Sequence, residues 1–414
     1  MDDRRKYFIF LFTTLITLIS IGSISYLLLS HISTVDVMTA RFLDSKKFRV
    51  EDCKDIKVFL TDLGGGRFWL KINQFYNVQY YDFEFNYDEE AIESIVSREF
   101  DVRHLVKDGR RISFVTNNVC GDYSEFRHLH SVHDYETKTS LLISKNLTVN
   151  GIIFNKYHIR NINNGKHIVI ELKNTVDTYG EIYYDNLLEA KEVNGIKNGM
   201  SINLNINVDY SKNNKILKTD VRIMNILIYW NAVAMLFSGL NQKFNIKIKK
   251  LNFAETAGVL FPKEPSMTYT LFGIYRSINN YFSKNRVSVR DNVDIQVAMT
   301  TADICLRAVA ADCDIKGYTL LLSDVRPSDK LNIAVINYSP LLLNYNLGAR
   351  EIAHSLGVKY EDCEGIMNRD NSRQSFTWCE ETLPEFRNIE EFIEILRMNG
   401  KSHRNSHIPL SLNY

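Results

Sequence analysis

Residues 350–360 read REIAHSLGVKY, and they continue a run of apolar residues with helical spacing. The apolar positions recur at steps of three and four: Leu342, Tyr345, Ala349, Ile352, Ala353 and Leu356. This spacing predicts a helix with one buried stripe. Gly357 should end that helix, because glycine best tolerates the left-handed backbone of a helix C-cap. Arg350 and His354 are four residues apart and therefore share one helical face, beside Glu351.

This stretch resembles the metzincin metalloprotease pattern H-E-x-x-H-x-x-G-x-x-H. Glu351, His354 and Gly357 stand at its Glu, its second His and its Gly. The sequence GIMN at 365–368 is similar to the Met-turn, whose methionine, here Met367, lies beneath the metal. Residues 200–400 are similar to the reprolysin (adamalysin, ADAM) family throughout. The resemblance implies a zinc endopeptidase site with Glu351 as general base and His354 as a ligand.

Other segments extend the resemblance. The sequence NIAVI at 332–336 resembles the edge strand that binds peptide substrate in the family. SFTWC at 375–379 resembles the family's Phe-Ser-x-Cys segment, and it implies a Cys363–Cys379 disulfide that clamps the Met-turn. The N-terminal half is similar to a reprolysin prodomain, most clearly at 100–109 and 140–162.

The zinc chemistry that the resemblance implies is incomplete in this chain. A catalytic zinc of this kind needs three protein ligands and a water, but Arg350 stands at the first ligand position and Tyr360 at the third. A guanidinium has no lone pair to offer, and it repels a divalent cation by several kcal/mol at about 4 Å. Tyrosine ligates only as a phenolate, from a pKa of about 10. We therefore expect no zinc cofactor, or weakly held zinc, and an impaired catalytic site.

Two explanations are open for Arg350. It is either the product of drift at a lost ligand position, or its guanidinium occupies the metal's place and pairs with Glu361 or Glu351. Residues 171–200 contain neither a cysteine that would hold latency through zinc nor a basic Arg-x-x-Arg processing site. Both absences agree with a protein that works without zinc.

The N-terminus predicts export. Arg4, Arg5 and Lys6 precede an uncharged apolar run at 7–30, which is close to the roughly 20 residues needed to cross a bilayer. Basic residues stay cytosolic, so the bulk of the chain should be lumenal or extracellular in a single-pass membrane protein. We expect an uncleaved signal anchor within 1–31. A long cleaved signal is the alternative, and both export the remainder.

Export makes the six cysteines candidates for disulfides. They divide between the two halves of the chain: Cys53, Cys120, Cys305, Cys313, Cys363 and Cys379. Spacing alone does not choose among the pairings, and the simplest scheme keeps pairs within each half. An ordinary disulfide between Cys53 and Cys120 is the expected pairing in the first half, and a latency role for Cys120 is the alternative. Asn146-Leu147-Thr148 is a glycosylation sequon.

The fold class follows from a change in pattern along the chain. Short alternating segments before residue 175 predict a mainly β domain. After a glycine-containing connector, strand-like segments at 202–208, 244–251, 317–323 and 331–337 alternate with helical spacing at 221–240 and 268–284. This alternation predicts an α/β sandwich with a largely parallel sheet. The expected parts are a tail and transmembrane helix at 1–31, a prodomain-like domain at 32–175, a connector at 176–200, a reprolysin-like domain at 201–400 and a tail at 401–414.

The formal net charge of +1 lacks the electrostatic footprint of a nucleic-acid binder. The expected function is that of a membrane-anchored, exported pseudoprotease that binds a peptide or protein partner in the former substrate cleft, through the edge strand. One alternative is an active zinc endopeptidase that recruits other ligands, such as His354 with Glu361 or Asp362. The other is a structural cell-surface protein.

Overall fold

The computed structural model describes much of the chain from Cys53 onward, and the described residues after Cys53 belong to one compact unit. The described residues are 53–64, 67–73, 81–86, 94–108, 111–115, 123–144, 146, 148–153, 155, 157–163, 166–171, 200–209, 219–240, 244–256, 259–262, 268–285, 293–306, 313, 315–319, 332–338, 344–369, 375–389 and 393. The predicted signal anchor, nearly all of the connector, Cys120 and the tail at 401–414 lie outside them. So does the side chain of Cys53.

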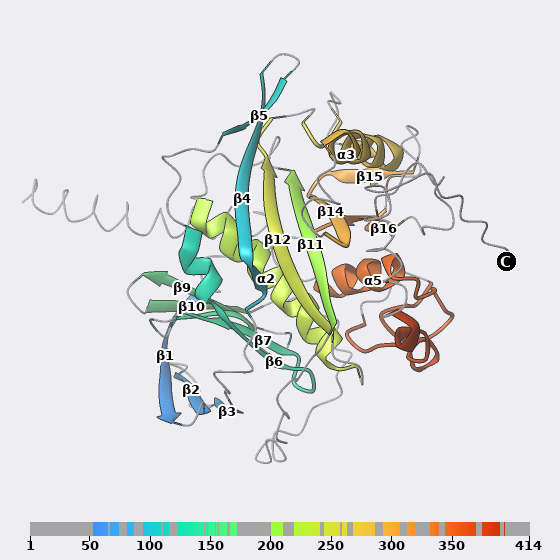
Figure 1. Cartoon of the computed structure of the whole chain (residues 1–414). Helices are drawn as coiled ribbons and strands as arrows, with labels where there is room; N and C mark the ends of the chain where they lie inside the picture. The colour runs from blue at the N-terminus through green and yellow to red at the C-terminus, as the bar shows by residue number, and fades with distance from the viewer. Residues whose placement is uncertain are drawn as a thin grey trace, which may run out of the picture. The chain divides into compact units, whose positions relative to one another are not determined.

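A seven-stranded, mostly parallel sheet forms the centre of the second half (Figure 1). Its order is β16 (Gly317–Thr319), β17 (Ile333–Asn337), β14 (Ile295–Thr300), β11 (Met200–Asp209), β12 (Phe244–Ala254), β4 (Val96–Asp108) and β5 (Arg111–Val115). The five inner strands run parallel, and β16 and β5 are antiparallel to their neighbours. The predicted α/β class with a largely parallel sheet is confirmed.

An eight-stranded sheet is built from the N-terminal half. Its order is β3 (Tyr81–Asn86), β2 (Arg67–Asn73), β1 (Cys53–Gly64), β10 (Lys166–Glu171), β9 (Tyr157–Asn163), β8 (Val149–Ile153), β7 (Thr139–Ile143) and β6 (His130–Asp134). A short 3₁₀ helix, η2 (Tyr123–His128), precedes β6. The short alternating segments predicted before residue 175 correspond to strands of this sheet, among them β1, β2, β7, β8 and β10.

Helix α2 (Thr219–Ser238) contacts both sheets, with β12 on one hand and β6, β7 and β8 on the other (Figure 1). Its residues from Ile223 to Phe237 are almost all buried, which explains why the helix is apolar around its whole circumference. Among the described residues, α2 is the one helix long and apolar enough to cross a membrane, but 83% of its apolar 18-residue stretch is buried inside the fold. A core helix meets the same length and hydropathy criteria.

One buried amide ties α2 to the N-terminal sheet. The Asn231 side chain donates to Ser140 Oγ at 2.9 Å and to the Leu141 carbonyl at 3.0 Å. Its Oδ1 lies 2.9 Å from Nε2 of His133 on β6. A buried amide is tolerated only when its donors and acceptor are satisfied, so these bonds fix the helix against the strands.

Strand β11 shows how alternation divides the central sheet into two faces. Ile202, Leu204, Ile206 and Val208 belong to the core that contains α2. Between them, Asn205 and Asn207 enter a buried amide network with Asn252 of β12 and Gln296 of β14. Helix α3 (Leu271–Asn285) contributes Ile274 and Ile278 to a second core, with residues from β4, β14 and β17.

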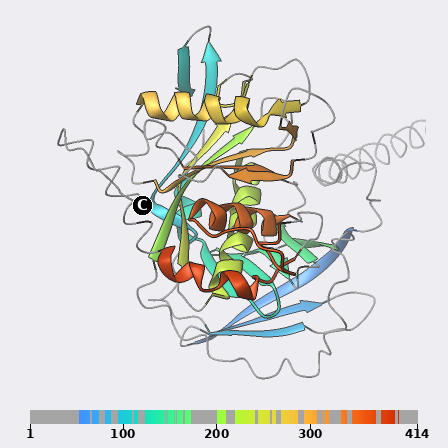
Figure 2. The same cartoon turned by 90° about the vertical axis from the view of Figure 1, so that its right-hand side faces the viewer.

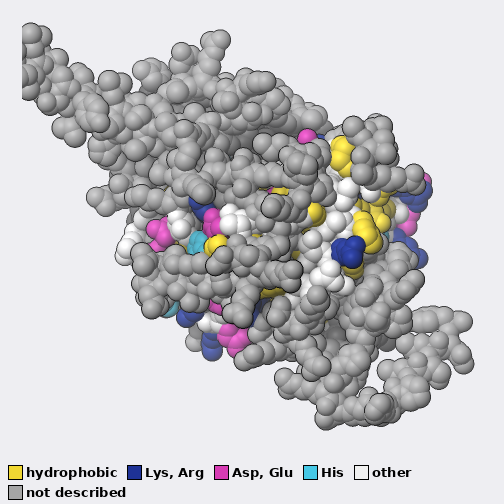
Figure 3. All heavy atoms as spheres, turned by 90° about the horizontal axis from the view of Figure 1, so that it is seen from above, with side chains coloured by type: hydrophobic (Ala, Val, Ile, Leu, Met, Phe, Trp, Pro, Cys, Tyr) yellow, Lys and Arg dark blue, Asp and Glu magenta, His cyan; other side chains and the backbone are white. Residues whose placement is uncertain are grey.

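Two short strands, β13 (Thr268–Thr270) and β15 (Asp303–Cys305), pair beside α3, as the turned view also shows (Figure 2). The exposed apolar side chains of this region are Phe272 and Leu306. Seen from above, the described surface mixes hydrophobic side chains with Lys and Arg on one side (Figure 3).

Two features differ from the sequence-based expectations. The segment 332–336 is not an edge strand, because β17 is paired on both sides and β16 holds the edge of the described sheet. In addition, β4 and β5 come from the predicted first domain (32–175) but complete the sheet of the second (201–400). Both differences arise from long-range strand pairing, which local patterns do not encode.

Candidate functional site

Helix α5 (Tyr345–Ser355) carries three residues of the predicted site, Arg350, Glu351 and His354, and it contacts α2, β16 and β17. The helix ends as predicted: Gly357 has φ +96°, and its N–H bonds the His354 carbonyl at 2.9 Å. At the other end, the Tyr345 hydroxyl donates to Asn155 Oδ1 at 2.9 Å, a bond that joins α5 to the N-terminal half.

The predicted Met-turn follows the helix. Met367 is completely buried against the main core. Its carbonyl accepts from the Glu361 N–H at 3.0 Å, and the Glu361 carbonyl accepts from the Arg369 N–H at 2.8 Å. The predicted Cys363–Cys379 disulfide is formed, and a second bridge joins Cys305 to Cys313.

Gly365 is required where the Met-turn meets this disulfide. A Cβ at that position would lie 2.5 Å from the backbone nitrogen of Cys379 and 2.7 Å from its Sγ. Only glycine allows the turn to approach the bridge so closely.

The side chains at the three predicted zinc-ligand positions, Arg350, His354 and Tyr360, lie close together, but they pack against one another. The His354 ring lies on the Tyr360 ring, with centroids 3.9 Å apart and an interplanar angle of 22°. The Arg350 guanidinium carbon lies 4.2 Å from the centroid of the same Tyr360 ring. The aromatic ring is therefore the common contact of the other two side chains, a cation–π and stacking arrangement.

Glu351 is completely buried beside this stack. The Thr319 hydroxyl of β16 lies 2.8 Å from its Oε2, and the Tyr360 hydroxyl donates to the carboxylate at 3.3 to 3.4 Å. Burial raises the pKa of Glu351 from 4.5 to about 7, although the charge of Arg350 and the two hydroxyl donors pull it down. A carboxyl group with this pKa is a fitting proton acceptor near neutral pH, but its oxygens are engaged by protein groups.

The residues present do not fit a catalytic zinc. Burial and the nearby Glu351 raise the pKa of Tyr360 above its ordinary value, which disfavours the phenolate that a metal needs. Arg350 has no lone pair for a metal. His354 keeps one feature of a ligand histidine: its Nδ1 donates to the Val358 carbonyl at 2.9 Å, a bond that orients the ring. One oriented imidazole is not a zinc site.

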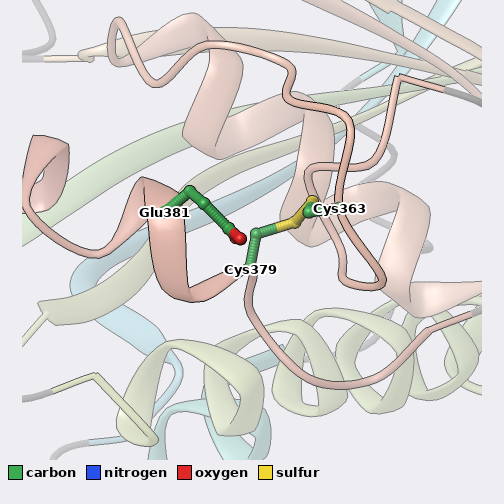
Figure 4. A group of neighbouring side chains, drawn as sticks. All are labelled: Cys363, Cys379 and Glu381. Carbon is green, nitrogen blue, oxygen red and sulfur yellow. A yellow bond between two sulfur atoms is a disulfide. The ribbon is translucent and has the colours of Figure 1, made fainter.

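The alternative ligands, His354 with Glu361 or Asp362, do not form a group of three ligand atoms among the described residues. Asp362 is exposed and faces Arg369, with 3.6 Å between the charged atoms. Within the described part of the chain, the one group of three potential ligand atoms is Cys363, Cys379 and Glu381, within 4.8 Å of one another (Figure 4). The two sulfurs of this group are bonded to each other, so neither is a thiolate.

The hypothesis that Arg350 pairs with Glu351 or Glu361 is wrong in its geometry. No carboxylate of the described residues lies within ion-pair distance of the guanidinium, which instead lies against Tyr360. Sequence reasoning also missed Thr319, because its partner Glu351 is 32 residues away and no local pattern marks the contact.

Comparisons with known proteins give little further identification. No protein-family model and no curated protein matches this chain. A similar solved structure is metalloproteinase-II from Bacteroides fragilis, which is 13% identical with a TM-score of 0.38 and covers 76% of this chain and 89% of that chain.

Proposed function

We propose that this protein is an exported, membrane-anchored pseudoprotease of the reprolysin type, which binds a peptide or protein partner without catalysing hydrolysis. The observation that carries the proposal is the stack of Arg350, Tyr360 and His354. The side chains at the ligand positions of the metzincin pattern contact each other through an aromatic ring, so these contacts occupy the place in which a metal would need three free ligand atoms.

The state of Glu351 supports the same conclusion. A general base must reach a water molecule that attacks the substrate. Here the carboxyl group is buried, and Thr319 and Tyr360 occupy its oxygens. A group held in this way serves the packing of β16 on α5.

The partner-binding part of the proposal relies on β16. This strand ends the described sheet and is paired on one side, with β17. An extended peptide adds to such an edge through main-chain hydrogen bonds. Export is supported by the two disulfides, which persist in oxidising compartments. Asn146 of the sequon is exposed and therefore accessible to glycosylation.

Metal analysis of the full-length chain, purified in detergent, tests the proposal. We expect far less than one zinc per chain and no cleavage of a denatured protein substrate. Stoichiometric zinc together with turnover that Glu351→Ala abolishes would show that the protein is an enzyme. Glu381→Ala, which removes an exposed carboxylate, is the matched control.

A further inference from the structure

The Cys363–Cys379 disulfide lies next to several acidic residues. Five of them flank its two cysteines in the sequence: Glu361, Asp362, Glu364, Glu380 and Glu381. All of these except Glu361 are exposed to solvent. Asp362 faces the guanidinium of Arg369 at 3.6 Å. A negatively charged reagent that approaches the bridge from solvent therefore meets charges of its own sign.

The Glu381 carboxylate lies beside the bridge itself. One of its oxygens and the two sulfur atoms all lie within 4.8 Å of one another, and Figure 4 shows the side chain extending toward Cys379. The residue belongs to a short 3₁₀ helix, η6 (Glu380–Thr382), which follows Cys379 directly. The Thr382 N–H and hydroxyl both donate to the Cys379 carbonyl, at 3.1 and 2.9 Å. These bonds tie the turn that carries Glu381 to the cysteine.

The two cysteines differ in accessibility. Cys379 is 3% exposed, whereas Cys363 is partly exposed. A thiolate from solvent therefore attacks the sulfur of Cys363, which forms a mixed disulfide and breaks the bond to Cys379. The electron pair of the broken bond leaves with the Cys379 sulfur as a thiolate. A second thiolate then attacks the mixed disulfide, so the reagent is oxidised to its own disulfide and both cysteines are reduced, with protons taken from water.

Glu381 opposes this reaction at both of its charged stages. Its carboxylate repels the incoming thiolate, and it also destabilises the thiolate that develops on Cys379, which burial already disfavours. A thiolate that forms less readily leaves more slowly. We propose that Glu381 protects the Cys363–Cys379 bridge from reduction by thiols. The inference is independent of the proposed function, because it concerns the persistence of a bridge and not the zinc content or the partner of the protein.

The protected bridge holds the predicted Met-turn against the segment that follows it. The Ile366 N–H donates to the Thr377 carbonyl at 2.7 Å, and a Cβ on Gly365 would lie 2.7 Å from the Cys379 sulfur. Reduction would remove the covalent link between these two closely packed segments. Resistance to thiols therefore preserves this part of the fold wherever small thiols are present.

The rate of reduction tests the proposal directly. Full-length wild type and Glu381→Gln, purified in detergent, are treated with the anionic thiol mercaptoethanesulfonate, and free cysteines are alkylated at intervals and located by peptide mass spectrometry. Glutamine keeps the shape and removes the charge, so we expect Cys363–Cys379 to be reduced about three- to tenfold faster in the variant. The gain should largely disappear in about 1 M salt, where the Debye length falls to about 3 Å.

Two controls isolate the position of the charge. Glu380→Gln removes the neighbouring exposed carboxylate, which is outside the group of three, and it should accelerate reduction less. The Cys305–Cys313 bridge of the same molecules should be reduced at one rate in all three proteins. Equal rates in wild type and Glu381→Gln would overturn the proposal, including the case in which neither protein is reduced. An equal or larger effect of Glu380→Gln, faster reduction of Cys305–Cys313 as well, or a gain that persists in high salt would also overturn it.

Discussion

Replacing Glu351 by glutamine should stabilise this protein, and the gain should depend on pH. The wild-type carboxyl group is buried, and its pKa is raised from 4.5 to about 7. Between these two values the unfolded chain is ionised while the folded chain stays protonated. Folding therefore becomes less favourable as pH rises through this window, and the loss is complete above pH 7.

The magnitude follows from the two pKa values. At about 1.4 kcal/mol for each pH unit, the buried carboxylate costs about 3 kcal/mol at pH 8 and below about 1 kcal/mol at pH 5. Glutamine has nearly the same shape, and the hydroxyls of Thr319 and Tyr360 can rotate to suit its amide. We expect Glu351→Gln to recover most of the cost at pH 8.

Urea unfolding followed by tryptophan fluorescence suits this measurement, because Trp230 and Trp378 are both buried in the main core. Wild type and Glu351→Gln are compared at pH 5 and pH 8, with Glu381→Gln as a control at an exposed position. A variant less stable than wild type at pH 8 would refute the reasoning. An equal gain at both pH values would also refute it, since the gain would then be unrelated to ionisation.

Three further predictions concern a buried histidine, two glycines and the predicted ligand positions. Burial lowers the pKa of His133 from 6.5 to about 4. The unfolded chain therefore takes up a proton that the folded chain does not, and the free energy of unfolding should fall by about 2 kcal/mol between pH 7 and pH 5. In the same unfolding assay, the stability of His133→Gln should depend less on pH. Gly365→Ala should lower the melting temperature strongly, because its Cβ would lie 2.5 Å from the backbone nitrogen of Cys379. Gly357→Ala should cost only about 1 kcal/mol of stability, because Gly357 has φ +96° but open space around it. Similar losses of stability in both variants would contradict this ranking. The double change Arg350→His with Tyr360→His should create a three-histidine set and bring zinc, measured by metal analysis, toward one per chain; either single change should not.

The helix at the site was predictable because its signals are local. The apolar spacing through Ile352 and Ala353, followed by Gly357, specifies where α5 runs and where it ends. The Cys363–Cys379 bridge followed from resemblance, and Gly365 shows why the surrounding turn accommodates it. Patterns that span one or two helical turns are thus sufficient for these features.

The arrangement of the side chains at the site was not predictable in the same way. Opposite charge suggested that Arg350 would meet a carboxylate, but Glu351 is held by Thr319 from a distant strand. The guanidinium lies instead on Tyr360, ten positions along the chain from it. The partner that Arg350 contacts depends on burial and on tertiary contacts, and a local sequence pattern shows neither of these.

Strand β4 has a consequence for any processing of this protein. Residues between Val96 and Leu105 pair with Ile248–Ala254 of β12, and the Leu105 carbonyl accepts from the Glu255 N–H at 3.0 Å. Arg222 and His104 both contact the Glu255 carboxylate, so side chains reinforce the same join. If the chain were cleaved between its N-terminal half and its second half, the two fragments would accordingly remain bound to each other and stabilise each other's fold, like the parts of a split reporter protein. If the second fragment were produced alone, the side of β12 that pairs with β4 would be an unpaired sheet edge, and the fragment would self-associate through it.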